Sequence, residues 1–118
     1  MNENDLIPKK RPMVGLLIAG ESNADLTLQG DKTITVCEGW RDYHTGDKVL
    51  LGYPDLNWCK LAKITSVNFY MLKDVPIKDI LSDGFADHED ALLNLQAYYQ
   101  NLTEDSPVTV IRWILISE

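Results

Sequence analysis

Long apolar runs, basic charge and cysteine are all scarce in this sequence of 118 residues. No uninterrupted apolar stretch approaches the ~18 residues that a membrane-spanning helix needs, so no membrane partner is expected. The two cysteines, Cys37 and Cys59, stand too far apart to resemble a zinc-ligand pair, and both are expected to be reduced, buried thiols. The opening residues 1–5 are acidic and polar, unlike a secretory signal, which predicts a cytoplasmic location.

Basic residues number 11 against 18 acidic ones, which gives a net charge of −7. The acidic excess is concentrated in one half, because residues 1–70 carry 8 basic and 9 acidic side chains and residues 71–118 carry 3 and 9. Proteins that follow a phosphate backbone usually show the opposite balance, since Lys and Arg replace the condensed counterions. The charge therefore argues against DNA and against tight, sequence-blind nucleic-acid binding. It is compatible with a small neutral ligand or a local basic groove.

Familiar catalytic signatures are also missing. There is no phosphate-binding Gly-Lys-Ser/Thr loop, no dinucleotide fingerprint and no Gly-x-Ser-x-Gly elbow. The run 87–90, Asp-His-Glu-Asp, is rich in metal-ligating atoms, but neighbours on a helix face different directions, and an acidic helix start explains it better. Cys37 and His44 could form a nucleophilic dyad, although nothing in the sequence places them together. No metal or cofactor is expected.

The pattern of apolar and β-branched residues predicts one domain over 13–118, preceded by a flexible lead-in over 1–12. The predicted strands cover 13–19, 32–37, 48–53, 58–70 and 108–116, and a turn is expected at 44–47. The strand over 58–70 is long and is expected to bend near Thr65 and Ser66. The strand over 108–116 is almost wholly apolar, which favours a central position with both faces covered.

Helices are expected on either side of the middle strands. A short one is predicted over 24–29 and a second over 76–84, with Asp74 as its cap. The clearest helix follows the cap Asp87, and its apolar residues recur at helical spacing: Leu92, Leu95, Tyr99 and Leu102. This order of elements predicts an α+β domain built on a small mixed sheet or barrel.

The most informative segment is 30–35, Gly-Asp-Lys-Thr-Ile-Thr, which is followed by the turn Thr45-Gly46-Asp47. It places a glycine turn, an ammonium group and two hydroxyls at the mouth of a strand. Such groups can donate hydrogen bonds to a carbonyl or phosphate oxygen. Taken alone, the same residues are explained by a strand with surface threonines.

The segment resembles the ASCH domain of the PUA-like superfamily, in particular the small bacterial enzymes that hydrolyse N4-acetylcytidine. Those enzymes carry a Gly-x-Lys-Thr-Ile-Thr motif after the first helix, then a Thr-Gly-Asp turn, then a glutamate about fifty residues later at the start of a helix. The three features fall here on 30–35, 45–47 and Glu89, and the resemblance covers roughly 13–116. It implies a small mixed β-barrel flanked by two or three helices, with a pocket at one end.

The resemblance also implies a catalytic set of Lys32, Thr35 and Glu89. Removal of an acetyl group from an exocyclic amine is acyl transfer, which needs a nucleophile, a proton acceptor and an oxyanion stabiliser. Thr35, or a water that it holds, would attack, Lys32 would handle the proton or the oxyanion, and Glu89 would orient one of them. The family often has an arginine where this chain has Cys37, and Arg41 is the candidate replacement.

Two physical constraints apply to this set. Positions 32 and 35 of a regular strand point to opposite faces, so their side chains converge only if the chain is irregular near residues 30–32. A nearby carboxylate raises the pKa of a lysine, so Lys32 paired with Glu89 would be a cationic oxyanion stabiliser rather than a base.

Substrate contacts are expected from residues near the pocket strands: Thr33, Trp40, Arg41, Tyr53 and Trp58. Flat aromatic rings are what a base stacks on, although core packing is the alternative for each ring taken singly. Trp113 lies inside the apolar last strand and is expected to be core.

Three functions therefore remain open. The first is an enzyme that hydrolyses an N-acyl group from a modified nucleoside. The second is an RNA-binding module or ribonuclease with a local basic groove, for which the cations would be Lys32, Arg41, Lys48, Lys60 and Lys63. The third is a protein-interaction module that uses the acidic second half. The motif with its distant glutamate and the acidic charge favour the first, with a small nucleoside as the partner.

Overall fold

The computed structural model describes residues 14–17, 33–53 and 56–116 of the chain. The predicted lead-in 1–12, the predicted helix 24–29 and Lys32 lie outside these residues. Within them, no helix is long and apolar enough to cross a membrane.

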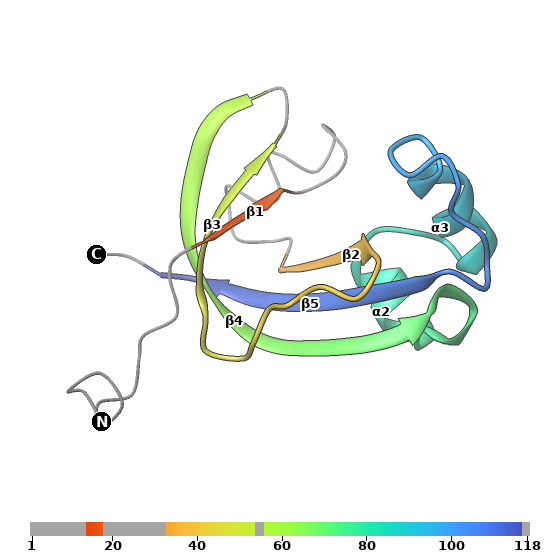
Figure 1. Cartoon of the computed structure of the whole chain (residues 1–118), viewed down its shortest axis with the longest axis horizontal. Helices are drawn as coiled ribbons and strands as arrows, with labels where there is room; N and C mark the ends of the chain where they lie inside the picture. Colours follow the sequence, from red (N-terminus) through yellow and green to blue (C-terminus); the bar gives the residue numbers. More distant parts are fainter. Residues whose placement is uncertain (1–13, 18–32, 54–55, 117–118) are drawn as a thin grey trace, which may run out of the picture.

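Five strands form one mixed sheet (Figure 1). They are β1 (Val14–Leu17), β2 (Ile34–Glu38), β3 (Lys48–Tyr53), β4 (Leu56–Met71) and β5 (Pro107–Leu115). Their order in the sheet is β1-β3-β4-β5-β2, with β1 parallel to β3 and the other neighbours antiparallel. The predicted α+β class and mixed sheet are confirmed.

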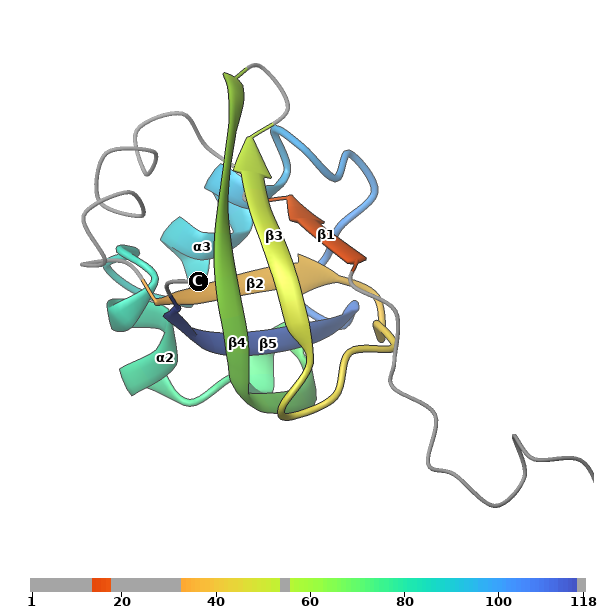
Figure 2. The ribbon, with the colours of Figure 1, turned by 90° about the vertical axis from the view of Figure 1, so that its left-hand side faces the viewer.

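The long strand β4 curls the sheet into a half-barrel. Its first part pairs with β3 and its second part with β5, and the register shifts between Ile64 and Ser66, where the bend was predicted. An irregularity of this kind increases local twist and bends the strand. Figure 2 shows β3 and β4 crossing over β5 and β2 as a result. The connection between β2 and β3 contacts the edge strand β1, where the Tyr43 hydroxyl donates a hydrogen bond to the Gly15 carbonyl at 2.8 Å.

The predicted turn before β3 is also present. Gly46 has a φ of 93°, which glycine adopts without the steric cost of a side chain. The Asp47 amide donates to the His44 carbonyl at 3.0 Å, and the Asp47 carboxylate accepts from the His44 amide at 2.9 Å. The turn therefore fixes the start of β3 at Lys48, as predicted.

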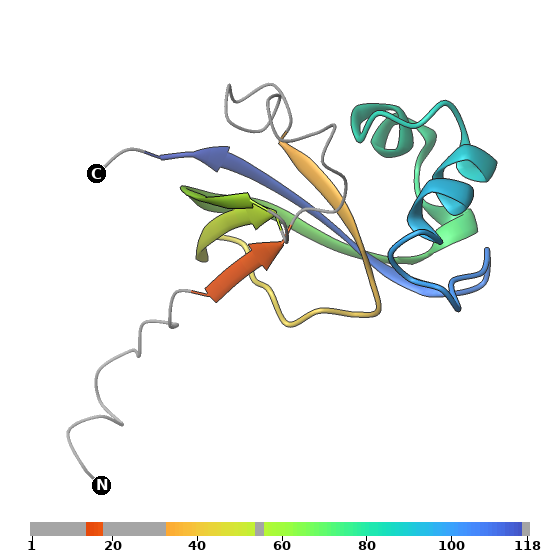
Figure 3. The same ribbon diagram turned by 90° about the horizontal axis from the view of Figure 1, so that it is seen from above.

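A 3₁₀ turn, η3 (Leu72–Asp74), and two helices, α2 (Ile77–Ser82) and α3 (His88–Leu95), follow β4 and lie together on one side of the sheet (Figure 3). Two helix predictions need correction. Asp74 belongs to η3, and the N-cap of α2 is Pro76 without a side-chain cap. Helix α3 ends at Leu95, and the chain continues in turns to Leu102. The Gln96 side chain donates to the Leu102 carbonyl at 3.0 Å, which returns Leu102 to the core that α3 covers.

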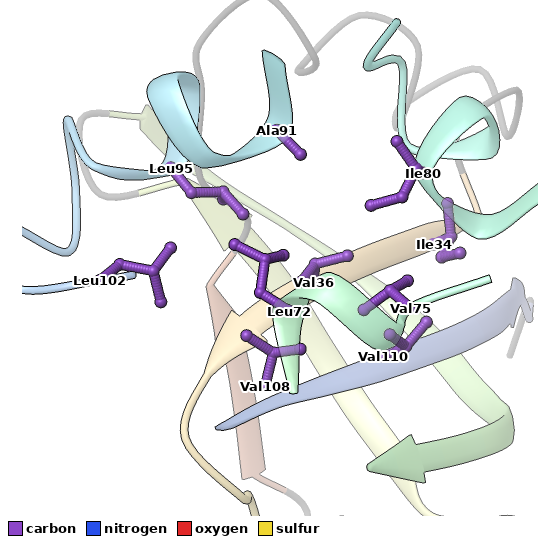
Figure 4. Packing of buried hydrophobic residues seen from close by; sticks show 10 residues of the cluster. All are labelled: Ile34, Val36, Leu72, Val75, Ile80, Ala91, Leu95, Leu102, Val108 and Val110. Carbon is purple, nitrogen blue, oxygen red and sulfur yellow. The ribbon is translucent and has the colours of Figure 1, made fainter. Parts of the chain in front are cut away.

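Two hydrophobic clusters lie on opposite faces of β2 and β5. The inner core lies on the inner face of the curled sheet and consists of Cys37, Val49, Leu51, Ala62, Ile64, Ile111 and Trp113. The helix-side core, drawn in Figure 4, consists of Ile34, Val36, Leu72, Val75, Ile80, Ala91, Leu95, Leu102, Val108 and Val110. Strand β5 contributes to both cores and lies between β4 and β2, which confirms the predicted central position. Trp113 is buried, as expected.

An ion pair also ties the helices to the sheet. Arg112 on β5 donates to the carboxylate of Asp79 on α2, and the Asp79 side chain is almost completely buried. Removal of either partner would leave a charge in a poorly solvated place, so the pair fixes the position of α2 over β5.

Candidate functional site

Thr35 is the centre of the predicted site, and the structure puts it on the inner face of the sheet. It stands directly opposite Ile111 of the inner core, and directly opposite residues of paired strands share a face. Its neighbours Ile34 and Val36 point the other way, into the helix-side core (Figure 4). Thr35 is only 4% exposed, so its hydroxyl lies in a low-dielectric position rather than on the surface. Thr33 is half-buried, and its carbonyl accepts from the Trp113 amide at 3.0 Å.

Glu89 lies in the first turn of α3, whose start is built as the sequence suggested. Asp87 caps the helix, accepting from the Asp90 amide at 2.8 Å, and the Asp90 carboxylate accepts from the Ala86 amide at 2.8 Å. These two carboxylates satisfy amides that a helix start leaves unpaired. Glu89 has no such role: its side chain is exposed.

Glu89 faces an open cleft of about 550 Å³ between α3, η3 and the segment before β5. The other residues that line it are Leu72, Lys73, His88, Leu92 and Glu104. His88 Nε2 donates to the Val75 carbonyl at 2.6 Å, so this ring nitrogen carries a proton. Lys73 forms an exposed ion pair with Asp105 at 2.7 Å, and the hydrogen bond to Asp105 raises the pKa of Lys73. The cleft thus joins an apolar floor to a rim with charges of both signs.

Thr35 and Glu89 lie on different sides of β2. Helix α3 packs on the face that Ile34 and Val36 occupy, whereas Thr35 projects to the inner face. Among the residues that the structure describes, no hydrogen bond joins the two side chains.

The end of β2 carries a second set of polar groups on the way to β3. Burial raises the pKa of the Tyr43 phenol; the nearby Cys37 thiol adds to this, and the Arg41 guanidinium opposes it. The pKa of Tyr99 is raised in the same way, first by burial and then by Cys37, while Arg41 and the Glu38 backbone oppose the rise. Both phenols therefore lie within electrostatic reach of Arg41.

Tyr99 was expected only as part of a helical stripe, and nothing in its local sequence pointed to Arg41. The turns after α3 bring Tyr99 within electrostatic reach of Arg41 and Cys37. Cys37 occupies the position where the family that this chain resembles often has arginine.

Trp40, one of the expected stacking residues, is 64% exposed. Its ring meets that of Phe69 on β4 edge to face, with 6.3 Å between the ring centroids. Phe69 stands opposite Thr109, which stands opposite Cys37, so Phe69 belongs to the inner face at the end where that face opens to solvent. Tyr53 ends β3 and Trp58 lies in β4, but both side chains are outside the described part of the structure.

The cations proposed for a basic groove do not follow one line. Lys48 stands opposite Lys63, and both alternate with residues of the inner core, so they project from the outer face of the sheet. Arg41 lies instead in the connection after β2. Lys60 stands opposite Leu51 of the inner core, so it shares the inner face. Among the described cations, the predicted groove is therefore divided between two surfaces.

Comparison with known proteins bears on the fold. No family model matches the chain, and no curated protein matches it in sequence. An ASCH domain from Lactobacillus crispatus JV V101 superposes with a TM-score of 0.64 at 18% identity, over 97% of this chain and 86% of that one. A protein of Enterococcus faecalis V583 from the family DUF984 gives a TM-score of 0.68 at 13% identity, with the same coverage of 97% and 86%. A hypothetical protein gives 0.66 at 16% identity, over 88% of this chain and 100% of the other.

These likenesses concern backbone architecture, since the identities are low. The chain has an ASCH-like fold, as its short motif and element order predicted.

Proposed function

We propose that this chain binds a nucleoside against the inner face of its curled sheet and hydrolyses an N-acyl group from it, with N4-acetylcytidine as the substrate. The observation that supports this most strongly is Thr35. Its hydroxyl, part of the Lys-Thr-Ile-Thr motif, lies nearly buried on the inner face of an ASCH-like fold. Burial of a polar group costs free energy, and packing alone would be served equally well by an apolar side chain at this position.

In the proposed reaction, the Thr35 oxygen, or a water that it holds, attacks the acyl carbon. Lys32 stabilises the oxyanion of the tetrahedral intermediate as a cation. The bond between the acyl carbon and the exocyclic nitrogen then breaks, and the nitrogen takes up the proton that the attacking hydroxyl gave up. If Thr35 is the nucleophile, a water then hydrolyses the acyl ester on Thr35 and restores its hydroxyl; if the attacker is water, acetate is released directly. The products are acetate and cytidine. Each step uses a residue type that is suited to it and needs no cofactor.

Glu89 enters this proposal through the resemblance alone, as a positioning group for Lys32 or for the attacking water, since the structure places it in the cleft on the helix side and Thr35 on the inner face. A carboxylate held near an ammonium favours the charged form of the lysine, which suits an oxyanion stabiliser.

A small ligand is better supported than a long RNA. Binding along a phosphate backbone needs several cations on one surface, whereas Lys48 and Lys63 lie on the outer face and, of the other described cations proposed for the groove, Lys60 lies on the inner face and Arg41 in the connection after β2. A single nucleoside needs only a pocket and a few polar contacts.

The test is release of cytidine from N4-acetylcytidine, followed by chromatography. The expected result is turnover by the unchanged protein and a loss of roughly 100-fold or more in both Thr35→Val and Glu89→Gln, as for removal of a nucleophile or a proton-handling group. Glu104→Gln is the matched control, because Glu104 lines the same cleft as Glu89. Absence of cytidine release by the unchanged protein contradicts the proposal.

A further inference from the structure

The cleft between α3, η3 and the segment before β5, called here the helix-side cleft, is separate from the inner face on which Thr35 lies. Its volume of about 550 Å³ is within the range of about 300–1,000 Å³ that is usual for small-molecule sites. Leu72, which is buried, and Leu92, which is half-buried, supply apolar surface in it. The cleft therefore offers both the room and the apolar surface that the aliphatic part of a small ligand needs.

Hydrogen bonds hold the walls of this cleft in place. The Lys73 amide donates to the Glu104 carbonyl at 2.9 Å, which fixes η3 against the segment before β5. On the other side, His88 donates to the Val75 carbonyl at 2.6 Å and so holds the start of α3 against the end of η3. Because the walls are already fixed, a ligand loses less free energy in ordering them when it binds.

Carboxylates dominate the charge at the rim of the helix-side cleft. Glu89 belongs to α3, and Glu104 belongs to the segment before β5. Both side chains are exposed, and within the described part of the chain neither forms an ion pair. Among the described residues, Lys73 is the only lysine or arginine that lines the cleft, and its ammonium already pairs with Asp105 at 2.7 Å. A ligand that neutralises the two glutamates must therefore carry positive charge of its own.

We propose that the helix-side cleft binds an aliphatic polyamine. Its ammonium groups pair with Glu89 and Glu104, since an ammonium donates charge-assisted hydrogen bonds to a carboxylate. Its methylene chain lies over Leu72 and Leu92, where removal of apolar surface from water is favourable. This site does not depend on the proposed reaction, to which the resemblance alone assigns Glu89.

Two other cationic occupants fit the helix-side cleft less well. A metal ion would use the two carboxylates but not the apolar surface, and it prefers more oxygen ligands than two side chains supply. A basic segment of a protein would extend beyond a cleft whose volume suits a small molecule. Charge and size together therefore favour the polyamine.

The experiment titrates spermidine into the full chain at low ionic strength and follows backbone amide NMR shifts, which report both the affinity and the location of binding. The largest shifts are expected at the residues that line the cleft: Leu72, Lys73, His88, Glu89, Leu92 and Glu104. Added salt should weaken the binding, because it screens exposed charges.

Two variants should change the affinity in opposite directions. Glu104→Gln is expected to weaken spermidine binding roughly 2- to 5-fold, the range for loss of one exposed ion pair. Lys73→Met removes an ammonium and keeps an aliphatic side chain, so it should strengthen binding by a similar factor. Asp42→Asn is the matched control: it removes one exposed carboxylate in the connection after β2 and should bind spermidine like the unchanged protein.

Four results would overturn the proposed site: no saturable shifts in the unchanged protein, shifts spread over the whole acidic surface, equal affinity in Glu104→Gln, or weaker binding by Lys73→Met. Mg²⁺ and a capped trilysine peptide, which has the same charge as spermidine, test the choice of occupant. Tighter binding of either one at the cleft would refute the polyamine.

Discussion

Thr109 provides a sharp test of the way the segment after β2 is held. Its buried hydroxyl is the only side-chain group in the described structure that bonds both Gly39 and Arg41. Thr109→Val keeps the shape of the side chain but leaves the Gly39 carbonyl and the Arg41 amide without this partner.

The cost can be worked out from the environment of the two groups. A buried group that loses its partner costs about 1–3 kcal/mol. Arg41 is exposed and Gly39 half-buried, so water can reach both groups, and the total is expected near the low end, about 1–2 kcal/mol. For a domain of this size that corresponds to a fall in Tm of roughly 3–10 °C.

The assay is urea unfolding of the unchanged protein, Thr109→Val and Thr109→Ser. Serine retains the hydroxyl but removes a buried methyl group, which by itself costs about 1 kcal/mol, so Thr109→Ser measures the loss of packing alone. The reasoning is refuted if Thr109→Val unfolds at the same urea concentration as the unchanged protein.

Two further predictions concern buried rings. The Trp113 Nε1–H is buried without a hydrogen-bond partner among the described residues. Trp113→Phe is therefore expected to change the unfolding free energy by less than about 1.5 kcal/mol, whereas Trp113→Ala should cost about 3–5 kcal/mol; similar losses in both variants would contradict this. Tyr43 and Tyr99 have raised pKa values, so the folded state holds their protons more tightly than the unfolded state. Their contribution to stability is complete below the usual tyrosine pKa of about 10 and is lost as the pH rises through the raised folded values. Tyr99→Phe should thus lose less stability than the unchanged protein between pH 9 and pH 11; identical alkaline curves for Tyr99→Phe and the unchanged protein would refute the shift.

Much of the fold could be read from local patterns. The β-branched run of β2, the glycine turn at Gly46 and the apolar run of β5 each dictate their own structure, because turn chemistry and burial on both faces restrict the choice of residues. The bend in β4 was also predicted, since no strand of 16 residues stays in register with two neighbours on a curled sheet.

The ends of the helices were less predictable. Leu95, Tyr99 and Leu102 keep helical spacing, but packing into the helix-side core needs only that Leu95 and Leu102 be buried, and turns achieve this as well as a helix does. Likewise, Asp74 is a residue type that often caps helices, but here it is the last residue of the 3₁₀ turn η3 and lies before the start of α2.

The site shows what a motif conveys and what it omits. The motif identified Thr35, and strand alternation alone could place its side chain opposite to Ile34 and Val36. Which of these two faces is the inner one depends on the curl of the sheet, which is a long-range property. The partnership of Trp40 with Phe69 depends on the pairing of β4 with β5, and no local pattern contains it.

The central claim is that a nucleoside binds on the inner face beside Thr35. The most direct measurement is the change in backbone amide NMR shifts when N4-acetylcytidine is added to Glu89→Gln, in which turnover is expected to be slow enough for the complex to be observed. The account predicts the largest shifts at Thr35, Cys37 and Ile111. Shifts confined to Lys73, His88 and Glu104 would put the ligand in the cleft on the helix side and contradict it.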